Sequence, residues 1–363
     1  MATTILSKNA DAVSVSPPGL FTRIGRLYRN FTLRVIFQAI ITVWAVITFT
    51  FFLIRLMPGN PVSVYVSALV NTQNMTYQQA AQMAASVFHY NPDASVVEQY
   101  FVYLGQLLHG DLGQSITSPG TQVIDQIVQY LPWTLFSVGL GLLVSFGLGI
   151  TLGTIMAYKR NSLLDHALSL ISSILSAVPN YIWGLLILII LGVELKWFNV
   201  GDFRGTYDAS VTPGFTPEFL FSILKHALLP VTVYVLGTLG SWMLNMRNST
   251  VSTLSEDYVN VAKARGLTSS RISISYVGRN AALPMFTLLA INIGFIIGGS
   301  VVIEQLFLYN GLGNFLFLSV TSRDYTSMQG VFLIITISVV ASNLLADLLY
   351  SRLDPRVRVG DAK

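Results

Sequence analysis

Long uncharged stretches alternate with short charged ones along this chain of 363 residues. The first stretch extends from Val35 to Ile54 and follows a group of arginines. A helix needs about 20 consecutive apolar residues to cross the hydrocarbon core of a bilayer. Five further uncharged stretches cover roughly residues 133–157, 167–192, 226–246, 283–303 and 325–346. The pattern predicts an all-α integral membrane protein with six transmembrane helices.

The composition agrees with this prediction and excludes several kinds of site. Hydrophobic residues make up 53% of the chain and charged residues only 10%, whereas a soluble domain has about 25% charged residues. The first apolar stretch is too long for a cleavable signal peptide, so we expect it to remain as the first helix. The chain has no cysteine, and its four histidines are scattered. Disulfides, thiolate metal sites and cysteine nucleophiles are therefore excluded, and we expect no metal site or other bound cofactor.

The basic residues predict the orientation. If the N-terminus lies in the cytoplasm, the cytoplasmic segments are 1–34, 158–166, 247–282 and 347–363. These segments hold 16 of the 21 Lys and Arg residues. This is the positive-inside distribution, which places both termini in the cytoplasm of a multi-pass plasma membrane protein. The excess of positive charge then reflects topology and does not indicate a nucleic-acid partner.

The chain divides into five regions on this basis. We expect a partly disordered cytoplasmic tail over residues 1–34, the first transmembrane helix over 35–54 and an extracytoplasmic region over 55–132. The last of these carries two or three candidate amphipathic helices, one of them around Val96–Leu108. A core domain over 133–350 then contains helices 2–6, with an irregular outer loop at 193–225. A cytoplasmic tail over 351–363 ends the chain.

The most informative segment is the cytoplasmic loop 247–282. Thr253 and Glu256 have the spacing of a capping box, and Gly266 can end a helix in the left-handed conformation. Thr268 can cap a second short helix. Leu254, Tyr258, Val261 and Ala262 are expected to share one apolar face. The result is a helix–Gly–helix elbow, which could either lie on lipid headgroups or dock another protein.

The elbow resembles the EAA loop of ABC importer permeases of the dipeptide, oligopeptide and nickel type. Within Glu256–Pro284, both Ala262–Gly266 (AKARG) and Arg279–Pro284 (RNAALP) fall at the family's spacing, whereas Tyr276 replaces its usual histidine. The resemblance covers about residues 30–358. Its other elements follow in order: Arg55–Pro61 (RLMPGNP), Gly110–Ser115 (GDLGQS), Gly299–Glu304 (GSVVIE), Gly311–Gly313, Arg323–Tyr325, Asp347–Tyr350 and Asp354–Arg356.

This resemblance implies a fold and a set of partners. The fold would be that of a type I ABC importer permease, with a coupling-helix elbow between helices 4 and 5. The partners would be a second permease subunit that forms a heterodimer with this one, two ATPase subunits that bind ATP-Mg, and an extracytoplasmic solute-binding protein. The residues of the ATPase-coupling loop would be Glu256, Asp257, Tyr258, Ala262, Lys263, Ala264, Arg265, Gly266 and Arg271.

The chain itself lacks a motor. A Walker A loop requires Gly-Lys before Ser or Thr, and none of the lysines follows a glycine. The chain is therefore expected to be a non-catalytic subunit, with ATP hydrolysis supplied by its partners. An intramembrane serine protease or metalloprotease would need a Gly-x-Ser-x-Gly or His-Glu-x-x-His motif, and both are absent.

Polar and small residues inside the predicted helices suggest a few further roles. Gly141, Ser145, Gly149 and Gly153 form a ridge that suits close helix packing better than a gate. Gln38 and Asn292 are candidates for lining the pathway, although packing hydrogen bonds would explain them equally well. Glu304 and Asp347 could pair with arginines, and Arg323 could pair with Asp324.

The substrate class stays open. The resemblance favours di- or oligopeptides, and the same machinery imports oligosaccharides, nickel chelates or opines in other members of the family. An ion-coupled secondary transporter is a weaker alternative, because the predicted spans contain almost no ionisable residues at mid-membrane.

Overall fold

A computed structural model of the chain describes residues 31–56, 61–88, 95–118, 120–298 and 301–353. Residues 1–30 of the predicted tail over 1–34 lie outside the described residues, as do the C-terminal residues 354–363 and the motif positions 57–60 and 299–300. The last four residues of the predicted tail are helical, because α2 begins at Phe31. The described chain is almost entirely helical, as the hydropathy pattern predicts.

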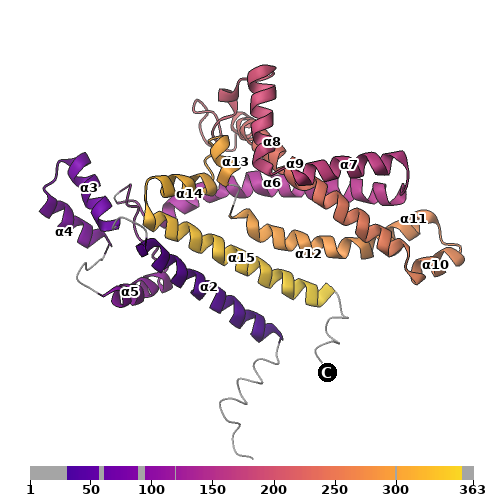
Figure 1. Ribbon diagram of the computed structural model, residues 1–363, viewed down its shortest axis with the longest axis horizontal. Coiled ribbons are helices and arrows are strands. Elements are labelled where there is room, and N and C mark those ends of the chain that lie inside the picture. The colour runs from indigo at the N-terminus through magenta and orange to yellow at the C-terminus, as the bar shows by residue number, and fades with distance from the viewer. Residues whose placement is uncertain (1–30, 57–60, 89–94, 119, 299–300, 354–363) are drawn as a thin grey trace, which may run out of the picture.

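Among the described residues, five helices are long and apolar enough to cross a membrane by length and composition. They correspond to the predicted spans 1, 2, 4, 5 and 6, although several extend beyond the predicted limits. Figure 1 shows them running along the long axis of the molecule. They are α2 (Phe31–Leu56), α6 (Val123–Tyr158), α9 (Pro217–Leu254), α12 (Arg279–Ile296) and α15 (Tyr325–Leu353).

The third predicted span, residues 167–192, is not one helix. It consists of α7 (Leu163–Ala177), α8 (Asn180–Leu186) and the π-helix η1 (Ile187–Glu194). The part before Pro179 and the part after it are bent by 97°. Proline disfavours helical backbone in the residue before it, and Val178 is extended, with ψ 123°. This third predicted span is therefore interrupted at Pro179, and α8 points away from the bundle in Figure 1.

The region predicted to be extracytoplasmic contains three helices before α6 among its described residues, in agreement with the two or three that the sequence predicts. They are α3 (Pro61–Gln73), α4 (Tyr77–Phe88) and α5 (Val96–Leu108). Tyr65 and Leu69 of α3 are buried against Tyr325 at the start of α15. Figure 1 places this group at the opposite end of the bundle from the 247–282 loop. The boundary at 132 shifts, because α6 already begins at Val123.

Two shorter helices, α13 (Val301–Leu306) and α14 (Leu312–Thr321), connect α12 to α15. The predicted irregular outer loop contains a 3-10 turn, η2 (Val200–Phe203), and ends where Thr216 caps α9. The Thr216 hydroxyl accepts a hydrogen bond from the Phe219 amide at 3.3 Å.

The small-residue ridge of α6 packs directly against α9. A Cβ atom added to Gly141 would lie 2.9 Å from the Tyr234 ring, and one added to Gly153 would lie 2.5 Å from the Met243 carbonyl oxygen. A Cβ atom on Gly149 would overlap Trp242. The prediction that the ridge serves packing is confirmed. Val138, Leu142, Met246 and Met285 extend this interface into a core that α6 and α9 share with α12.

We predict that Gly153→Ala destabilises the protein by about 1–3 kcal/mol, because its methyl group would overpack the α6–α9 interface. Gly147→Ala on the same helix is the matched control, since an added Cβ there meets no atom within 4 Å. Thermal unfolding of the purified protein in detergent measures the difference. Equal melting temperatures for the two variants would show that the close approach has little energetic weight.

Candidate functional site

The 247–282 loop forms an elbow at the end of α9. Its first arm is α10 (Asp257–Ala264). The predicted capping box is wrong: Glu256 is the N-cap residue and makes no side-chain capping hydrogen bond. Thr253 instead donates to the Ser249 carbonyl at 2.8 Å. The reason is that α9 continues to Leu254, so Thr253 lies in its last turn, where a hydroxyl commonly bonds a carbonyl four residues back.

Gly266 ends α10 as predicted. Its φ is +73°, in the left-handed region. The Gly266 amide donates to the Lys263 carbonyl at 2.9 Å, and the Leu267 amide donates to the Ala262 carbonyl at 3.3 Å. This pair of hydrogen bonds is the Schellman arrangement, which satisfies carbonyls that the helix end leaves free. The chain thus reverses sharply after α10.

The second arm differs from the predicted short helix. Thr268 is at the N-cap of α11 (Ser269–Arg271), without a side-chain capping bond. The helix then continues through the π-helix η3 (Ile272–Gly278) into α12. The second arm is therefore an extension of a membrane-spanning helix. Movement of the elbow would act directly on α12.

A small apolar core holds the two arms together. Val259 and Ala262 of α10 are buried against Ile272 and Val277 of η3. The predicted apolar face is only partly right, because Val261 is 55% exposed and Val259 takes its place in the core. Val259 and Ala262 are three residues apart, so they lie on the same face of α10, and this face packs against the second arm. The sequence of α10 alone does not show on which side the second arm lies.

Two polar contacts add to this core. The Asn280 side-chain amide donates to the Tyr258 hydroxyl at 3.0 Å and to the Tyr276 carbonyl at 2.7 Å. The Ser249 hydroxyl donates to the Ala281 carbonyl at 2.8 Å, which joins α9 to α12. Asn280 belongs to the RNAALP motif, so the motif has a structural role in bracing the elbow.

The outer surface of the elbow is exposed and charged. Among the predicted coupling residues only Ala262 is buried. Within the described segments, the charged members of this set form no ion pair with another residue. The acids lie at the start of α10, and the cations lie at its end and on the second arm. The exposed members are Glu256, Asp257, Tyr258, Lys263, Ala264, Arg265, Gly266 and Arg271.

Glu304 of the GSVVIE motif is buried without a basic partner among the described residues. It accepts hydrogen bonds from the Thr134 hydroxyl at 2.8 Å and from the backbone amide of Asn314 at 3.0 Å. Gly311 lies so close that any Cβ there would overlap the carboxylate. The expectation that Glu304 pairs with an arginine is wrong. Backbone and hydroxyl donors of α6 and α14 satisfy it instead.

Asp324 is a second buried carboxylate, and it too differs from the prediction. It accepts from the Ser115 hydroxyl at 2.5 Å and from the Ile116 amide at 3.1 Å. It also caps α15 through the Ser327 amide at 3.1 Å. No ion pair with Arg323 is present in the described part of the chain. Asp324 therefore connects the Arg323–Tyr325 motif to the end of the GDLGQS motif.

The structure leaves the pathway candidates as predictions. Gln38 is exposed on α2. Asn292 is half-buried on α12 and donates to the Leu288 carbonyl of its own helix at 2.8 Å. The side chain of Asp347 lies outside the described residues.

The sequence analysis missed one contact near the elbow, the ion pair between Asp165 of α7 and Arg247 of α9. A local signal was present: Ser162 caps α7 and accepts from the Asp165 amide at 3.3 Å. The Ser-x-x-Asp spacing before an apolar run is typical of a helix start. It could have located Asp165 but not its partner.

We predict that Gly266→Ala loosens α10, because alanine disfavours the left-handed backbone by about 1–2 kcal/mol. An added Cβ meets no atom within 4 Å, so the effect is confined to the backbone. Hydrogen exchange of the α10 amides should accelerate by roughly 5- to 30-fold if they open locally. Gly266→Asn, which tolerates this conformation better, should exchange more slowly than the alanine variant. Unchanged exchange in Gly266→Ala would contradict the role of this turn.

Comparison with known proteins gives a consistent result. Residues 149–359 match the family described as binding-protein-dependent transport system inner membrane component. The chain is 34% identical to a putative peptide permease protein of Brucella suis over 85% of this chain and 92% of the relative. It is 31% identical to a di/tripeptide transport system permease protein of Pseudomonas aeruginosa, over 87% and 95%. For an oligopeptide transport system permease protein of Bacillus subtilis the identity is 29%, over 85% and 92%.

Proposed function

The chain belongs to the family of binding-protein-dependent transport system inner membrane components, and we propose that it forms half of the translocation pathway of an ATP-driven peptide importer. It would span the cell inner membrane several times, with both termini in the cytoplasm. The distribution of Lys and Arg supports this orientation.

The observation that carries the proposal is the exposed elbow. Its inner face is fixed by Val259, Ala262 and the Asn280 contacts, while its outer charges have no partner within the described residues. Such a surface is suited to a protein partner, because exposed acids and cations can form complementary pairs that position two proteins. The partner we propose is an ATPase subunit, whose closure on ATP-Mg would move the elbow.

The elbow connects two membrane helices, so its movement has a direct mechanical consequence. Only Ser255 and Glu256 separate the end of α9 from α10, and the second arm of the elbow is continuous with α12. A push on α10 would tilt both helices together. Two copies of this device, one on each permease subunit, would couple two ATPase subunits to one pathway.

A second permease subunit is proposed because the helices leave large apolar faces uncovered. In the most apolar window of α2 only 6% of the residues are buried within the chain, and in α6 and α9 only 33%. Lipid covers part of such a surface, and a second subunit would cover the rest and close the pathway. A heterodimer and an extracytoplasmic solute-binding protein complete the proposed assembly.

For the substrate we propose di- or oligopeptides. The support comes from the relatives, which are described as peptide, di/tripeptide and oligopeptide permease proteins. Oligosaccharides, nickel chelates and opines are the alternatives within the same machinery. Selectivity would lie mainly in the separate solute-binding protein.

Charge reversal tests the docking role of the elbow. Arg265→Glu should lower ATPase co-purification and uptake by about tenfold or more, because it places an acid opposite acidic groups of the partner. Lys196→Glu is the matched control, since Lys196 is an exposed cation in the outer loop. The proposed site is wrong if Arg265→Glu retains full co-purification and uptake.

Uptake of labelled peptides tests the substrate and the energy source. Proteoliposomes that contain the complete complex should accumulate a labelled tripeptide only when ATP is present on the side of the membrane that carries the elbow. The binding protein must also be present. Unlabelled peptides should compete, whereas oligosaccharides, nickel chelates and opines should not. Transport by this chain alone, driven by an ion gradient, would instead support a secondary transporter.

A further inference from the structure

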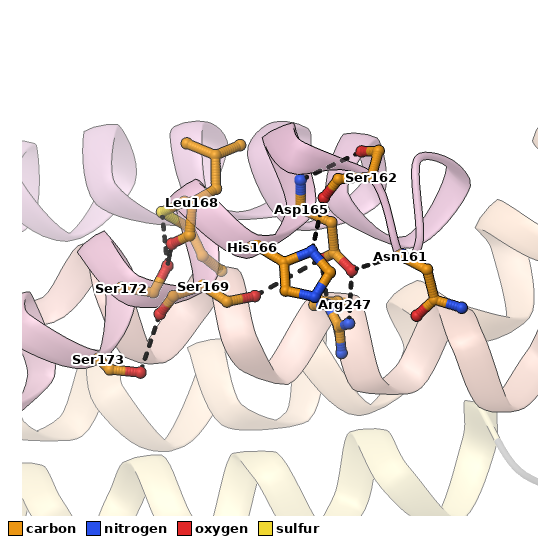
Figure 2. Close-up of polar contacts among 10 residues, drawn as sticks. Asn161, Ser162, Asp165, His166, Leu168, Ser169, Ser172, Ser173 and Arg247 are labelled. Atoms are coloured by element: carbon orange, nitrogen blue, oxygen red, sulfur yellow. Dashed lines mark hydrogen bonds and ion pairs between the residues drawn. The ribbon is translucent and has the colours of Figure 1, made fainter.

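The bundle contains one ion pair among the described residues, and it lies near the elbow. Figure 2 shows Asp165 at the start of α7 facing Arg247 of α9. The Arg247 Nε atom donates to Asp165 Oδ1 at 2.6 Å, and Nη2 donates to Oδ2 at 2.8 Å. Asp165 is only 2% exposed. A two-point contact of this kind fixes the orientation of both groups, because the planar guanidinium matches the carboxylate in one geometry.

The same carboxylate also holds the turn between α6 and α7. The backbone amide of Asn161 donates to Asp165 Oδ2 at 3.0 Å. Asn161 has a φ of +66°, so it supplies the left-handed position that this turn needs. Ser169 contributes a longer contact of 3.5 Å to Oδ1. Asp165 therefore connects the end of α6, the start of α7 and α9.

The helix that carries Arg247 leads straight into the elbow. Arg247 lies about two turns before Leu254, where α9 ends. At the level of Arg247, α9 is also in close contact with α6, because a Cβ on Gly153 would lie 3.1 Å from the Arg247 amide nitrogen. A displacement of the elbow is thus delivered to α9 next to the point where α7 is attached.

Further along, α7 and α8 lie against α9 without any other ion pair in the described chain. Gly240 of α9 allows the close approach of Ser176, whose hydroxyl would lie 2.5 Å from an added Cβ, and Gly237 receives Asn180 of α8. Two single-point hydrogen bonds of 3.4 Å also join α7 to α9, one from the Ser172 hydroxyl to the Met243 sulfur and one between the Ser176 and Ser241 hydroxyls. Among the described residues, the charged two-point contact between these helices is the one at Asp165.

We propose that the Asp165–Arg247 pair is a positioning clamp that makes α7 move as one body with the elbow end of α9. This inference rests on the proposed function, because it assigns the clamp to the transmission of ATPase movement. The pair would pass the displacement of α10 to α7, and through it to α8 beyond the break at Pro179. Neither residue is expected to touch the transported solute.

The first test measures movement. The chain has no cysteine, so spin labels at Leu163→Cys and Ser252→Cys would be unique, and both positions are exposed. In the complete complex in nanodiscs, the distance between the labels on α7 and α9 should stay the same with and without a non-hydrolysable ATP analogue. Adding Arg247→Lys, which keeps the charge but loses the two-point contact, should broaden or shift the distance when nucleotide binds. A nucleotide-dependent change with Arg247 intact would overturn the proposal.

The second test measures coupling. Asp165→Asn and Arg247→Lys should lower the amount of peptide transported per ATP hydrolysed by about 2- to 30-fold, the range in which residues along a coupling route act. Arg160→Lys, an exposed cation of the neighbouring turn, is the control. If transport and ATP hydrolysis fall equally, in proportion to the amount of folded complex, the pair is only structural. If the unmodified complex shows no ATP-dependent uptake, the proposed function itself fails, which is a separate outcome.

Discussion

The close approach of α6 and α9 positions the rest of the described bundle. It depends on glycines at 141, 149 and 153, because any side chain there would meet Tyr234, Trp242 or Met243. Without a strong hydrophobic force between helices in lipid, such contacts supply much of the association through van der Waals packing. Once these two helices are in register, α12 packs against their shared core and α7 packs along α9. The elbow then has a rigid base.

Polar groups in the bundle act where chain segments must be joined at defined points. Asp324 joins the loop after α5 to the start of α15, and Glu304 joins α6 to the first turn of α14. Asp165 joins α7 to α9 on the elbow side. In each case a buried carboxylate receives several donors, as a buried charge must to offset the loss of water. Between these points the helices are held mainly by apolar packing, with single hydrogen bonds such as the one from the Ser249 hydroxyl to the Ala281 carbonyl.

The fold was largely accessible from the sequence because its main signals are local. Hydropathy and charge located five continuous spans, and Gly266 marked the reversal of the elbow. Three details depended on tertiary context. The 97° bend at Pro179 requires knowledge of what α8 packs against. The burial of Val259 in place of Val261 is decided by the second arm. Asp165 and Arg247 are 82 residues apart, so no local pattern connects them.

The break at Pro179 has a consequence for the surrounding lipid. α7 contains 15 residues, which is a length of about 22 Å against roughly 30 Å of hydrocarbon. The helix is therefore too short to match the bilayer, and the carbonyls freed at the bend cannot face acyl chains without a donor. Either the bilayer thins beside α7, or another protein surface covers the bend. In the first case this side of the subunit experiences hydrophobic mismatch, so its environment should depend on membrane thickness.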